Sequence, residues 1–453
     1  MIDLYEYINR NIIFPIYHKR HNDPRLKQLS NLEKNQYLTH DELMMLSWNK
    51  FKNLLEYAYN HTVYYNELLN NLSKTPNDFT SFEDIEIIPV LTKDILRDRQ
   101  DDLISDKFIK SDLILDTSGG STGIPTEFYK DINRNNIRRA DQIRHDRWSG
   151  WDIGKKYALL WGAPKDNQHY NNLKQRIYFR YIERNIILDA FDITDEKYSE
   201  FTKTLERYKP SMILGYANLL YQYAKYLNRK CPNHTIRPEG IVSSAETLSP
   251  DMKKVIEEAF KCKVLNRYGS REVGLIASEC KSQNGLHINI DNIYAEVVDS
   301  NHKHVSPGTE GNILVTDYYN YAMPLIRYDL GDVGVMSKST CDCGRSLPLL
   351  ERVVGRKSDF FVTRSGKLIH GEYFTHLFYG INGIKQFQVI QDSHQQITIN
   401  VVKSTDTDID LSNVVSSIKD KMEADIDIVI NYMDKIMPSA SGKYLFTKSN
   451  ISF

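Results

Sequence analysis

The pattern of apolar and polar positions divides the chain into three parts of different character. Residues Thr39–Leu72 carry apolar side chains at helical spacing, and Thr39 followed by Glu42 has the pattern of a capping box at a helix start. From Ile85 onward, short apolar or β-branched runs separated by turn residues replace the helical spacing. We therefore expect residues 1–84 to be the helical start of a larger domain.

Predicted strands and helices then alternate along the middle of the chain. The predicted strands are Leu113–Leu115, Tyr157–Trp161, Ser211–Leu214, Gly240–Val242 and Val264–Leu265. The predicted helices are Asn133–Trp148, Glu196–Tyr208, Leu219–Asn228 and Pro250–Phe260. Alternation of this kind is typical of an α/β domain.

The last third of the chain changes character twice. Tyr294–Val335 is rich in short strands and turns, which favours a β-rich subdomain. Beyond Gly355 come two strands that could pair, a helix and a further strand: Phe387–Gln391, Ile397–Val402, Leu411–Met422 and Ile428–Tyr432. We therefore expect residues 85–355 to form the core of a large α/β domain and residues 356–453 to form a small α+β domain.

Composition excludes several classes of protein. A length of 453 residues exceeds one small core, and 41% hydrophobic with 26% charged residues is ordinary for a globular protein in water. The formal net charge of −1 gives no overall field that attracts nucleic acid. The start MIDLYEYINR has acids where a secretory signal would be basic, and five cysteines are too few for a disulfide framework. We therefore expect a cytoplasmic protein without a nucleic-acid partner.

One segment near the start leaves two interpretations open. Tyr7–Arg20 joins an apolar patch to a basic flank, as do segments that lie on a membrane surface or dock on a membrane-bound partner. Segments of this kind more commonly pack on their own domain, and Pro15 is expected to interrupt a long amphipathic stripe.

The densest chemical signal is the glycine-rich stretch Asp116–Thr126, DTSGGSTGIPT. Glycines let backbone N–H groups approach an anion closely, and short hydroxyl side chains add donors. The candidate phosphate-binding residues are Ser118, Gly119, Gly120, Ser121, Thr122 and Gly123. The stretch lacks the Gly-Lys-Ser/Thr ending of the mononucleotide P-loop, and its composition alone is equally that of a flexible surface loop.

Four further segments follow the glycine-rich stretch in a fixed order. They are Asn266–Gly274 (NRYGSREVG), Ile326–Asp332 (IRYDLGD), Val354–Asp359 (VGRKSD) and Ser439–Tyr444 (SASGKY). Each alone is typical of an ordinary turn. In this order they resemble the motifs of the adenylate-forming superfamily, which comprises acyl-CoA synthetases, luciferases and the adenylation domains of peptide synthetases.

The resemblance spans roughly Ile85 to the C-terminus and is strongest to the phenylacetate–CoA ligase family, in its branch of capsular-polysaccharide biosynthesis proteins. The stretches GLHIN (Gly285–Asn289) and CDCGR (Cys341–Arg345) add to it. The resemblance implies an α/β fold, in which a large adenylating domain of α/β subdomains and a β-rich subdomain precedes a small mobile C-terminal lid.

The resemblance also implies roles for single residues. Glu272 matches the carboxylate that holds Mg²⁺ on the ATP phosphates, and an oxygen ligand is what that ion prefers. Tyr268 with Gly269 matches the segment whose aromatic ring covers the adenine. Asp332 matches the acceptor for the ribose hydroxyls, and Arg356 matches a second ribose contact.

Two more segments complete the implied nucleotide site. Ser244, Ala245 and Glu246 resemble the segment that lines the adenine pocket. Lys443 matches the lysine of the mobile lid that reaches the α-phosphate and the carboxylate during adenylation. A compact ammonium on a flexible stem suits that task, because attack of a carboxylate on a phosphate brings two anions together.

Three positions depart from the superfamily pattern. Thr126 stands where many members have lysine, although threonine is usual in the phenylacetate-ligase branch. Ser358 occupies the hinge position, where aspartate or lysine is common, so the energetics of domain rotation are open. Arg271 stands where serine or threonine is usual, and its charge could assist a phosphate or distort the motif.

A second constellation is a group of three cysteines and a histidine: Cys280, His287, Cys341 and Cys343. Three thiolates and an imidazole match the tetrahedral ligand set of Zn²⁺. With all four positions filled by protein the metal would be structural. The alternative is four ordinary residues, as we expect for Cys231 and Cys262, which lack such company.

The resemblance implies a carboxylate-adenylating ligase that uses ATP, Mg²⁺ and a carboxylic acid, and that passes the acyl group to CoA or to an amine. Trp161 and Tyr216, with Gly162 and Ala217, would line the acyl pocket, although such aromatic residues are equally typical of a core. The alternative is a catalytically inactive protein that keeps the fold and serves in the assembly of envelope polysaccharide.

Overall fold

The computed structural model describes residues 3–117, 126–161, 172–189, 194–356, 360–365, 368–378, 381–404, 409–422, 426–437 and 445–451. It divides into two compact units: one ends at Val354 and the other begins at Gly355.

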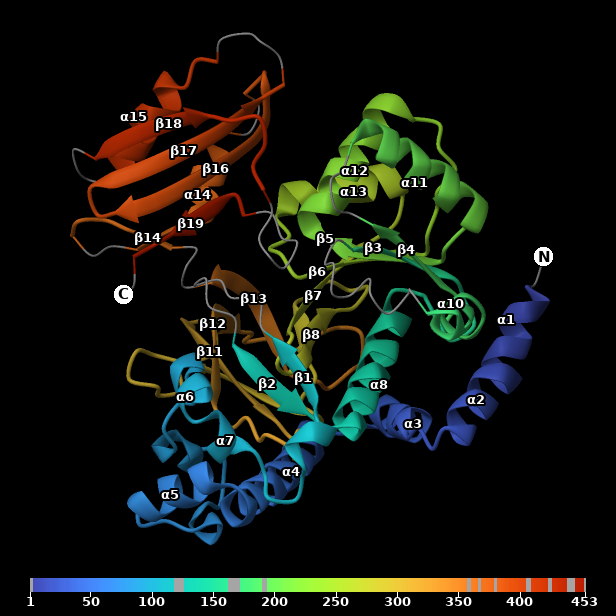
Figure 1. Cartoon of the computed structure of the whole chain (residues 1–453), viewed down its shortest axis with the longest axis vertical. Coiled ribbons are helices and arrows are strands. Elements are labelled where there is room, and N and C mark those ends of the chain that lie inside the picture. The colour runs from blue at the N-terminus through green and yellow to red at the C-terminus, as the bar shows by residue number, and fades with distance from the viewer. Residues whose placement is uncertain are drawn as a thin grey trace. The chain divides into compact units, whose positions relative to one another are not determined.

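The first unit is built on an eleven-stranded sheet of order β10-β11-β12-β13-β9-β8-β7-β6-β5-β3-β4 (Figure 1). The five strands at the β4 end pair in parallel. These are β3 (Tyr157–Trp161), β4 (Asn185–Asp189), β5 (Met212–Tyr216), β6 (Gly240–Ser244) and β7 (Val264–Ser270). The sequence predicted four of them, whereas β4 was missed.

Helices cover both faces of the parallel strands. They are α8 (Ile132–Trp148), α11 (Asp195–Tyr208), α12 (Ala217–Lys230) and α13 (Pro250–Phe260), and each was predicted to within a few residues. Successive residues of β5 show the two faces, since Ile213 packs in the core under α11, α12 and α13, while Met212 packs with α8. The predicted α/β class is confirmed.

The other half of the sheet is antiparallel and matches the predicted β-rich subdomain. Its strands are β8 (Gly274–Glu279), β9 (Leu286–Ile288), β10 (Ile293–Val298), β11 (Glu310–Asp317), β12 (Tyr328–Met336) and β13 (Leu349–Arg356). The change from parallel to antiparallel pairing occurs between β7 and β8. The strand predicted at Leu113–Leu115 instead belongs to a separate hairpin of β1 (Ile114–Thr117) and β2 (Glu127–Lys130).

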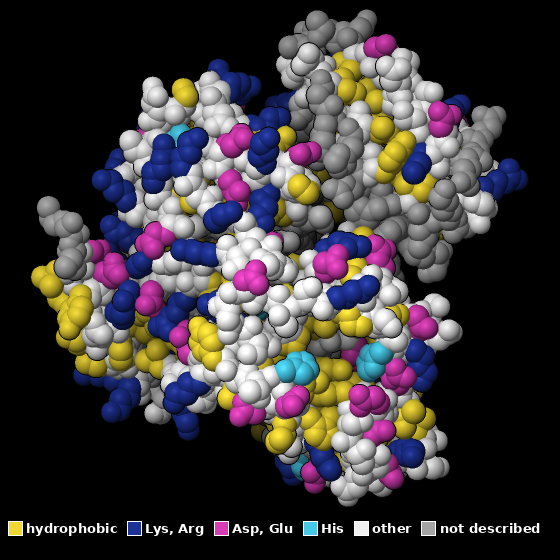
Figure 2. Space-filling model, turned by 180° about the vertical axis from the view of Figure 1, so that it is seen from behind, with side chains coloured by type: hydrophobic (Ala, Val, Ile, Leu, Met, Phe, Trp, Pro, Cys, Tyr) yellow, Lys and Arg dark blue, Asp and Glu magenta, His cyan; other side chains and the backbone are white. Residues whose placement is uncertain are grey.

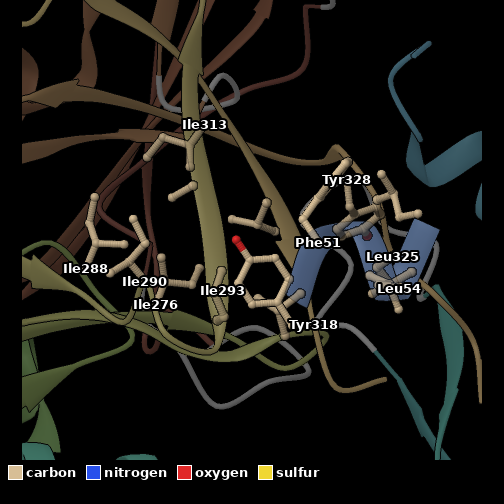
Figure 3. Close-up of a cluster of buried hydrophobic side chains, with 14 of the residues drawn as sticks. Phe51, Leu54, Ile276, Ile288, Ile290, Ile293, Ile313, Tyr318, Leu325 and Tyr328 are labelled. Carbon is tan, nitrogen blue, oxygen red and sulfur yellow. The ribbon is translucent and has the colours of Figure 1, made fainter. Parts of the chain in front are cut away.

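The helical start packs on the antiparallel half. Helix α4 (His40–His61) begins with the predicted capping box of Thr39 and Glu42 and precedes α5 (Val63–Asn71). Phe51 and Leu54 of α4 are fully buried against Leu325 and Tyr328 (Figure 3). Burial of these large apolar side chains joins α4 to the antiparallel half of the sheet.

The N-terminal helices differ from the expectation at Pro15. Helix α1 (Leu4–Ile8) continues through a π-helical turn, η1 (Asn9–Ile13), into α2 (Phe14–Arg20), so Pro15 does not interrupt the helical run. The π turn changes the hydrogen-bond register, and Pro15 occupies the first turn of α2, where a missing N–H is tolerated. Helix α3 (Arg25–Asn35) follows.

The second unit contains a four-stranded sheet of order β18-β17-β16-β19. Its elements are β16 (Ile384–Ser393), β17 (Gln396–Lys403), α15 (Ser412–Met422), β18 (Asp427–Tyr432) and β19 (Thr447–Ser449). A hairpin of β14 (Phe360–Val362) and β15 (Leu368–His370) and helix α14 (Gly371–His376) precede them. The predicted strands pair as expected, with Phe387 opposite Val401. Val414 and Ile418 of α15 pack in this unit's own core.

A buried ion pair fixes α8 against the antiparallel half. The Arg144 guanidinium donates to both carboxylate oxygens of Asp291 at 2.9 Å, and neither side chain is exposed. Arg144 also donates to the carbonyl oxygen of Leu32 in α3 at 3.1 Å. Because the guanidinium is fully desolvated, removal of its partner leaves an uncompensated charge in the interior.

We predict that Asp291→Ala lowers the free energy of unfolding of the first unit by about 3–5 kcal/mol. The matched control is Glu310→Gln, which removes the exposed ion pair with Arg352 and should cost at most about 1 kcal/mol. Urea denaturation followed by tryptophan fluorescence measures both. Equal effects of the two substitutions would contradict the importance of the buried pair.

Candidate functional site

The carboxyl ends of the parallel strands bring several predicted site residues to one edge of the sheet. Strand β3 ends at Trp161, β5 at Tyr216 and β6 at Ser244, and Tyr216 lies opposite Ser244 in the register. The rings of Trp161 and Tyr216 are 4.2 Å apart. Tyr216 is buried in the core under the helices and Trp161 is partly buried against it, so both also serve the packing.

The turn between β7 and β8 carries the segment expected to hold adenine and Mg²⁺. Tyr268 and Gly269 lie near the end of β7 at a bulge, and Glu272 lies in the turn before Gly274. A Cβ atom on Gly269 would lie 2.4 Å from the carbonyl oxygen of Gly274. Position 269 therefore requires glycine for this turn to close.

Strand β12 approaches the same turn through two hydrogen bonds. The Tyr268 hydroxyl donates to Oδ2 of Asp332 at 2.8 Å. The Tyr328 hydroxyl donates to Oε1 of Glu272 at 3.4 Å, and both of these side chains are buried. Burial raises the pKa of Tyr328, with Glu272 as the next cause, so this hydroxyl keeps its proton. Glu272 and Asp332 are thus drawn to one site although 60 residues separate the segments.

Tyr328 was not selected from the sequence as a site residue. It belongs to the Arg-Tyr-x-x-Gly-Asp motif, of which only the aspartate, Asp332, was given a role. The signal for it was therefore present in the motif, whereas the contact with Glu272 depends on how β12 lies against the β7–β8 turn.

The segment Ser244–Glu246 follows β6 at the same edge. Ala245 has a backbone φ of +70°, a conformation that is unfavourable for a residue with a Cβ and is often kept at functional sites. The Glu246 carboxylate accepts a hydrogen bond from the backbone N–H of Asn218, in the first turn of α12, at 2.8 Å. This contact holds the segment against the start of α12.

The hairpin β1–β2 brings the flanks of the glycine-rich stretch toward the β7–β8 turn. Arg271 of that turn lies 3.8 Å from Asp116 at the end of β1, and Lys130 of β2 pairs with Asp116 at 2.8 Å. Burial alone would raise the pKa of Asp116, but the hydrogen bond from Lys130 and nearby positive charge hold it below its usual value. On the far side, Arg97 donates to Oγ1 of Thr126 at 3.3 Å. The Arg271 side chain therefore extends from the β7–β8 turn to Asp116, beside the glycine-rich stretch.

Several predicted residues lie outside the described residues. These are Ser118, Gly119, Gly120, Ser121, Thr122, Gly123, Gly162, Ser358 and Lys443. Arg356 is the last residue of β13, but its side chain is not among those described. Their roles remain predictions.

The four predicted metal ligands lie together. The ligand atoms of Cys280, His287, Cys341 and Cys343 are all within 4.8 Å of one another. The sulfur atoms of Cys280 and Cys341 are 3.6 Å apart, and Sγ of Cys343 is 3.4 Å from Nε2 of His287. Neighbouring ligands of a tetrahedral zinc ion with bonds of about 2.3 Å lie about 3.8 Å apart, so the spacing fits that ion.

The chemistry of these side chains also fits a metal. Burial, with the charge of Arg345 as the next cause, lowers the pKa of His287 to about 4, so its imidazole is neutral and can act as a ligand. Burial raises the pKa of the Cys341 thiol to about 12, and a bound cation would favour the thiolate instead. The cluster joins the β8–β9 turn to the loop between β12 and β13.

The metal cluster and the β7–β8 turn occupy opposite ends of one strand. Cys280 follows the last residue of β8, whereas Glu272 precedes its first residue, Gly274. A six-residue strand spans about 20 Å. The cluster is therefore separate from Glu272.

Comparisons with known proteins identify relatives of the chain. Residues 361–450 match the family model described as the CapK C-terminal domain. Protein CapK of Staphylococcus aureus is 24% identical and covers 91% of this chain and 90% of its own length. Phenylacetate-coenzyme A ligase of Thermus thermophilus is 23% identical over 72% of this chain and 73% of its own length. The chain is a homologue of CapK and of phenylacetate-coenzyme A ligases.

A solved structure extends the agreement to the fold of the whole chain. The crystal structure of 2-hydroxyisobutyryl-CoA ligase in the postadenylation state, in complex with R3-HIB-AMP, has a TM-score of 0.71 and 17% identity. The match covers 92% of this chain and 91% of that one. The fold is that of the adenylate-forming ligases, as the resemblance implied. Among the described residues, none of the helices combines the length and hydropathy needed to cross a bilayer.

Proposed function

We propose that this protein is an AMP-forming ligase that activates a carboxylic acid with ATP. The observation that carries the proposal is the meeting of Tyr268, Glu272 and Asp332 at the edge where β3, β5 and β6 end. Ligands of α/β sheets bind at the carboxyl ends of parallel strands, where the order or direction of the strands changes. Homology to phenylacetate-coenzyme A ligases supports the reaction class.

The residues suit the two ends of a nucleotide. Asp332 offers carboxylate oxygens to ribose hydroxyls, beside the ring of Tyr268 for the adenine. Glu272 offers a hard oxygen ligand for Mg²⁺, oriented by the Tyr328 hydroxyl. When bound, Mg²⁺ would supply positive charge to the phosphates.

In the proposed first half-reaction, a carboxylate oxygen of the acid attacks the α-phosphorus of ATP. The bond to the pyrophosphate oxygen breaks, and acyl-AMP and pyrophosphate form. The acid is ionised at neutral pH, so no general base is required. Lys443 and the N–H groups of residues 118–123 would oppose the negative charge that builds on the phosphate.

The second half-reaction passes the acyl group to CoA or to an amine. The phenylacetate-coenzyme A ligases favour CoA, whereas the relation to CapK favours a step in capsule or exopolysaccharide synthesis, where the acceptor would be an amino sugar or another amine. Faster release of AMP with free CoA or with hydroxylamine separates the two. The alternative is a protein that lacks the reaction but serves in polysaccharide assembly. ATP–pyrophosphate exchange by the native protein would contradict this alternative.

Replacement of Lys443 by alanine should lower ATP–pyrophosphate exchange by about 100-fold or more, since it removes charge that stabilises the transition state. ATP binding, followed by equilibrium dialysis, should change little. The control is Lys385→Ala, which removes an exposed lysine on β16 of the same unit and should leave exchange unchanged. Wild-type exchange in the Lys443→Ala variant would contradict the role of this lysine, and no exchange by the native protein with any of a panel of carboxylic acids would contradict the proposed reaction.

We also propose that Cys280, His287, Cys341 and Cys343 hold a structural Zn²⁺. The spacing of the four ligand atoms and the neutral imidazole support this. The ion would tie the β8–β9 turn to the β12–β13 loop without an open coordination position, so it would take no part in the reaction.

Cys343→Ser should release the metal and lower the thermal midpoint of unfolding. A ligand present at 1,000 times its dissociation constant stabilises the folded state by about 4 kcal/mol, which sets the scale of the loss. Metal content by mass spectrometry and thermal unfolding measure the two effects. Cys262→Ser, outside the cluster, is the matched control and should change neither. The proposed zinc site would be contradicted if the native protein contained no metal and the Cys343→Ser variant were equally stable.

A further inference from the structure

The N-terminal helical run presents its apolar side chains to solvent. Leu4, Tyr7, Ile12 and Ile16 are between 47% and 69% exposed. Phe14 is the only apolar side chain of residues 4–20 that is buried. A helix that packs on its own domain normally turns its apolar residues inward, as Phe14 does here and Ile8 and Ile13 do in part, so these four exposed side chains form a second apolar face that the domain does not cover.

Polar contacts add to the packing of Phe14 in holding the helical run on the first unit. Asp3 pairs with Arg184 at 2.7 Å, and the Asn9 amide donates to the carbonyl oxygen of Tyr181 at 2.8 Å. Nε of Arg10 donates to the carbonyl oxygen of Ile153 at 2.9 Å. The helical run is therefore anchored by hydrogen bonds and charge as well as by Phe14, and the four exposed apolar side chains take no part in this anchoring.

The backbone of the N-terminal helical run lies close to the backbone at Gly154. Gly154 has a φ of +89°, and a Cβ atom on it would lie 2.5 Å from the carbonyl oxygen of Glu6. The backbone of the helix thus rests against the backbone of the loop after α8, and the exposed face belongs to the docked helix.

A second helical segment beside it has the same character. Helix α10 (Leu173–Ile177) continues as a π-helical turn, η6 (Tyr178–Ile182), and contacts the N-terminal run through the rings of Tyr17 and Tyr178 at 5.0 Å. Leu173, Ile177 and Tyr181, each four residues from the next, are all at least half exposed. We call residues 3–20 and 172–182 together the N-terminal apolar surface (Figure 2, left edge).

Among the described residues, the charged side chains of this surface that lie outside ion pairs are all positive. Its exposed basic side chains are Lys19, Arg20, Lys174, Arg176 and Arg180, and none of them forms an ion pair among the described residues. Its only acids are Asp3 and Glu6, which are paired with Arg184 and Arg10. Nothing acidic on the surface therefore offsets the five basic groups.

We propose that the N-terminal apolar surface binds the face of an anionic lipid bilayer. Apolar side chains on a rigid helix, flanked by basic groups, give the two contributions that hold a peripheral protein on such a bilayer: insertion of apolar area and attraction to acidic headgroups. The long aliphatic stems of lysine and arginine let their charges reach the headgroups while the apolar residues enter the boundary. This inference goes beyond the proposed ligase reaction and does not depend on it.

The test is co-sedimentation of the full-length protein with vesicles of phosphatidylcholine alone and of phosphatidylcholine mixed with phosphatidylglycerol. The native protein should bind the mixed vesicles and not the neutral ones, with binding that weakens as salt is raised. Ile12→Gln/Ile16→Gln should weaken binding by at least about tenfold. Met45→Gln, on the exposed side of α4, removes an equally exposed apolar side chain elsewhere and should have no effect.

A second pair of variants tests the charge. Lys174→Gln/Arg176→Gln should weaken binding to the mixed vesicles by about 30-fold, from the usual contribution of a basic residue near an anionic surface. Lys203→Gln/Lys230→Gln removes two exposed lysines from α11 and α12 and is the control. Because all of these side chains are exposed, thermal unfolding should be unchanged in every variant.

Three results would overturn the proposal. One is a native protein that binds neither kind of vesicle, and another is equal binding to neutral and anionic vesicles. The third is a native dimer by sedimentation velocity that Ile12→Gln/Ile16→Gln converts to a monomer, which would make the surface an interface between two copies. ATP–pyrophosphate exchange by the same variants separates this question from that of the reaction, since loss of lipid binding should leave exchange intact.

Discussion

The turn between β7 and β8 is the constraint on which the candidate site depends. Strands before it run parallel, so their carboxyl ends share one edge, and strands after it pair antiparallel. The turn closes only because residue 269 is glycine and leaves room for the carbonyl oxygen of Gly274. It places Tyr268 on the last parallel strand and Glu272 just beyond it, where β12 supplies Asp332 and Tyr328. One tight turn therefore joins the two halves of the sheet and positions both Tyr268 and Glu272 for their contacts with β12.

Buried ion pairs fix the relation of α8 to the antiparallel half. Arg134 and Arg144 lie on α8, and their carboxylate partners are Asp317 at the end of β11 and Asp291 before β10. Desolvation of an arginine is costly unless its donors are satisfied by carboxylates and carbonyl oxygens. The Arg144–Asp291 pair is bidentate, and its geometry leaves less freedom to shift than apolar packing does. These pairs thus specify the position of α8, beside the sheet edge that carries the candidate site.

The sequence predicted those parts of the fold whose signals are local. Helix α13 was predicted with its observed ends, and the structure shows the local signals that set its start: Ser249 caps it and Pro250 lies in its first turn. Strand β4 was missed although Ile186–Leu188 is an apolar run, and the structure shows that it is the edge strand, which pairs with β3 alone. The continuation of the N-terminal helical run past Pro15 could not be predicted, since the π turn before this residue is not visible in the residue pattern.

The candidate site divides in the same way. Tyr268, Glu272 and Asp332 could be selected from the sequence because each belongs to a short local motif, and the structure brings the motifs together. The contact between Tyr328 and Glu272 could not be predicted, since it depends on packing between segments that are distant in sequence. The ligand types of Cys280, His287, Cys341 and Cys343 suggested one cluster. The sequence alone could not show that their two segments meet, which the structure does.

The metal cluster and the candidate nucleotide site are linked by the strands that they share. The four ligands join the β8–β9 turn to the loop after β12, at the ends of these strands away from Glu272 and Asp332. Strand β12 carries Asp332, and β8 begins directly after the turn with Glu272, but β9 and β13 separate them in the sheet. The hydrogen bonds of the sheet therefore connect β12 to β8 only indirectly, through β13 and β9. An ion held by the four side chains would add a direct constraint on the same two strands, and its physical effect would be to keep the two carboxylates in register.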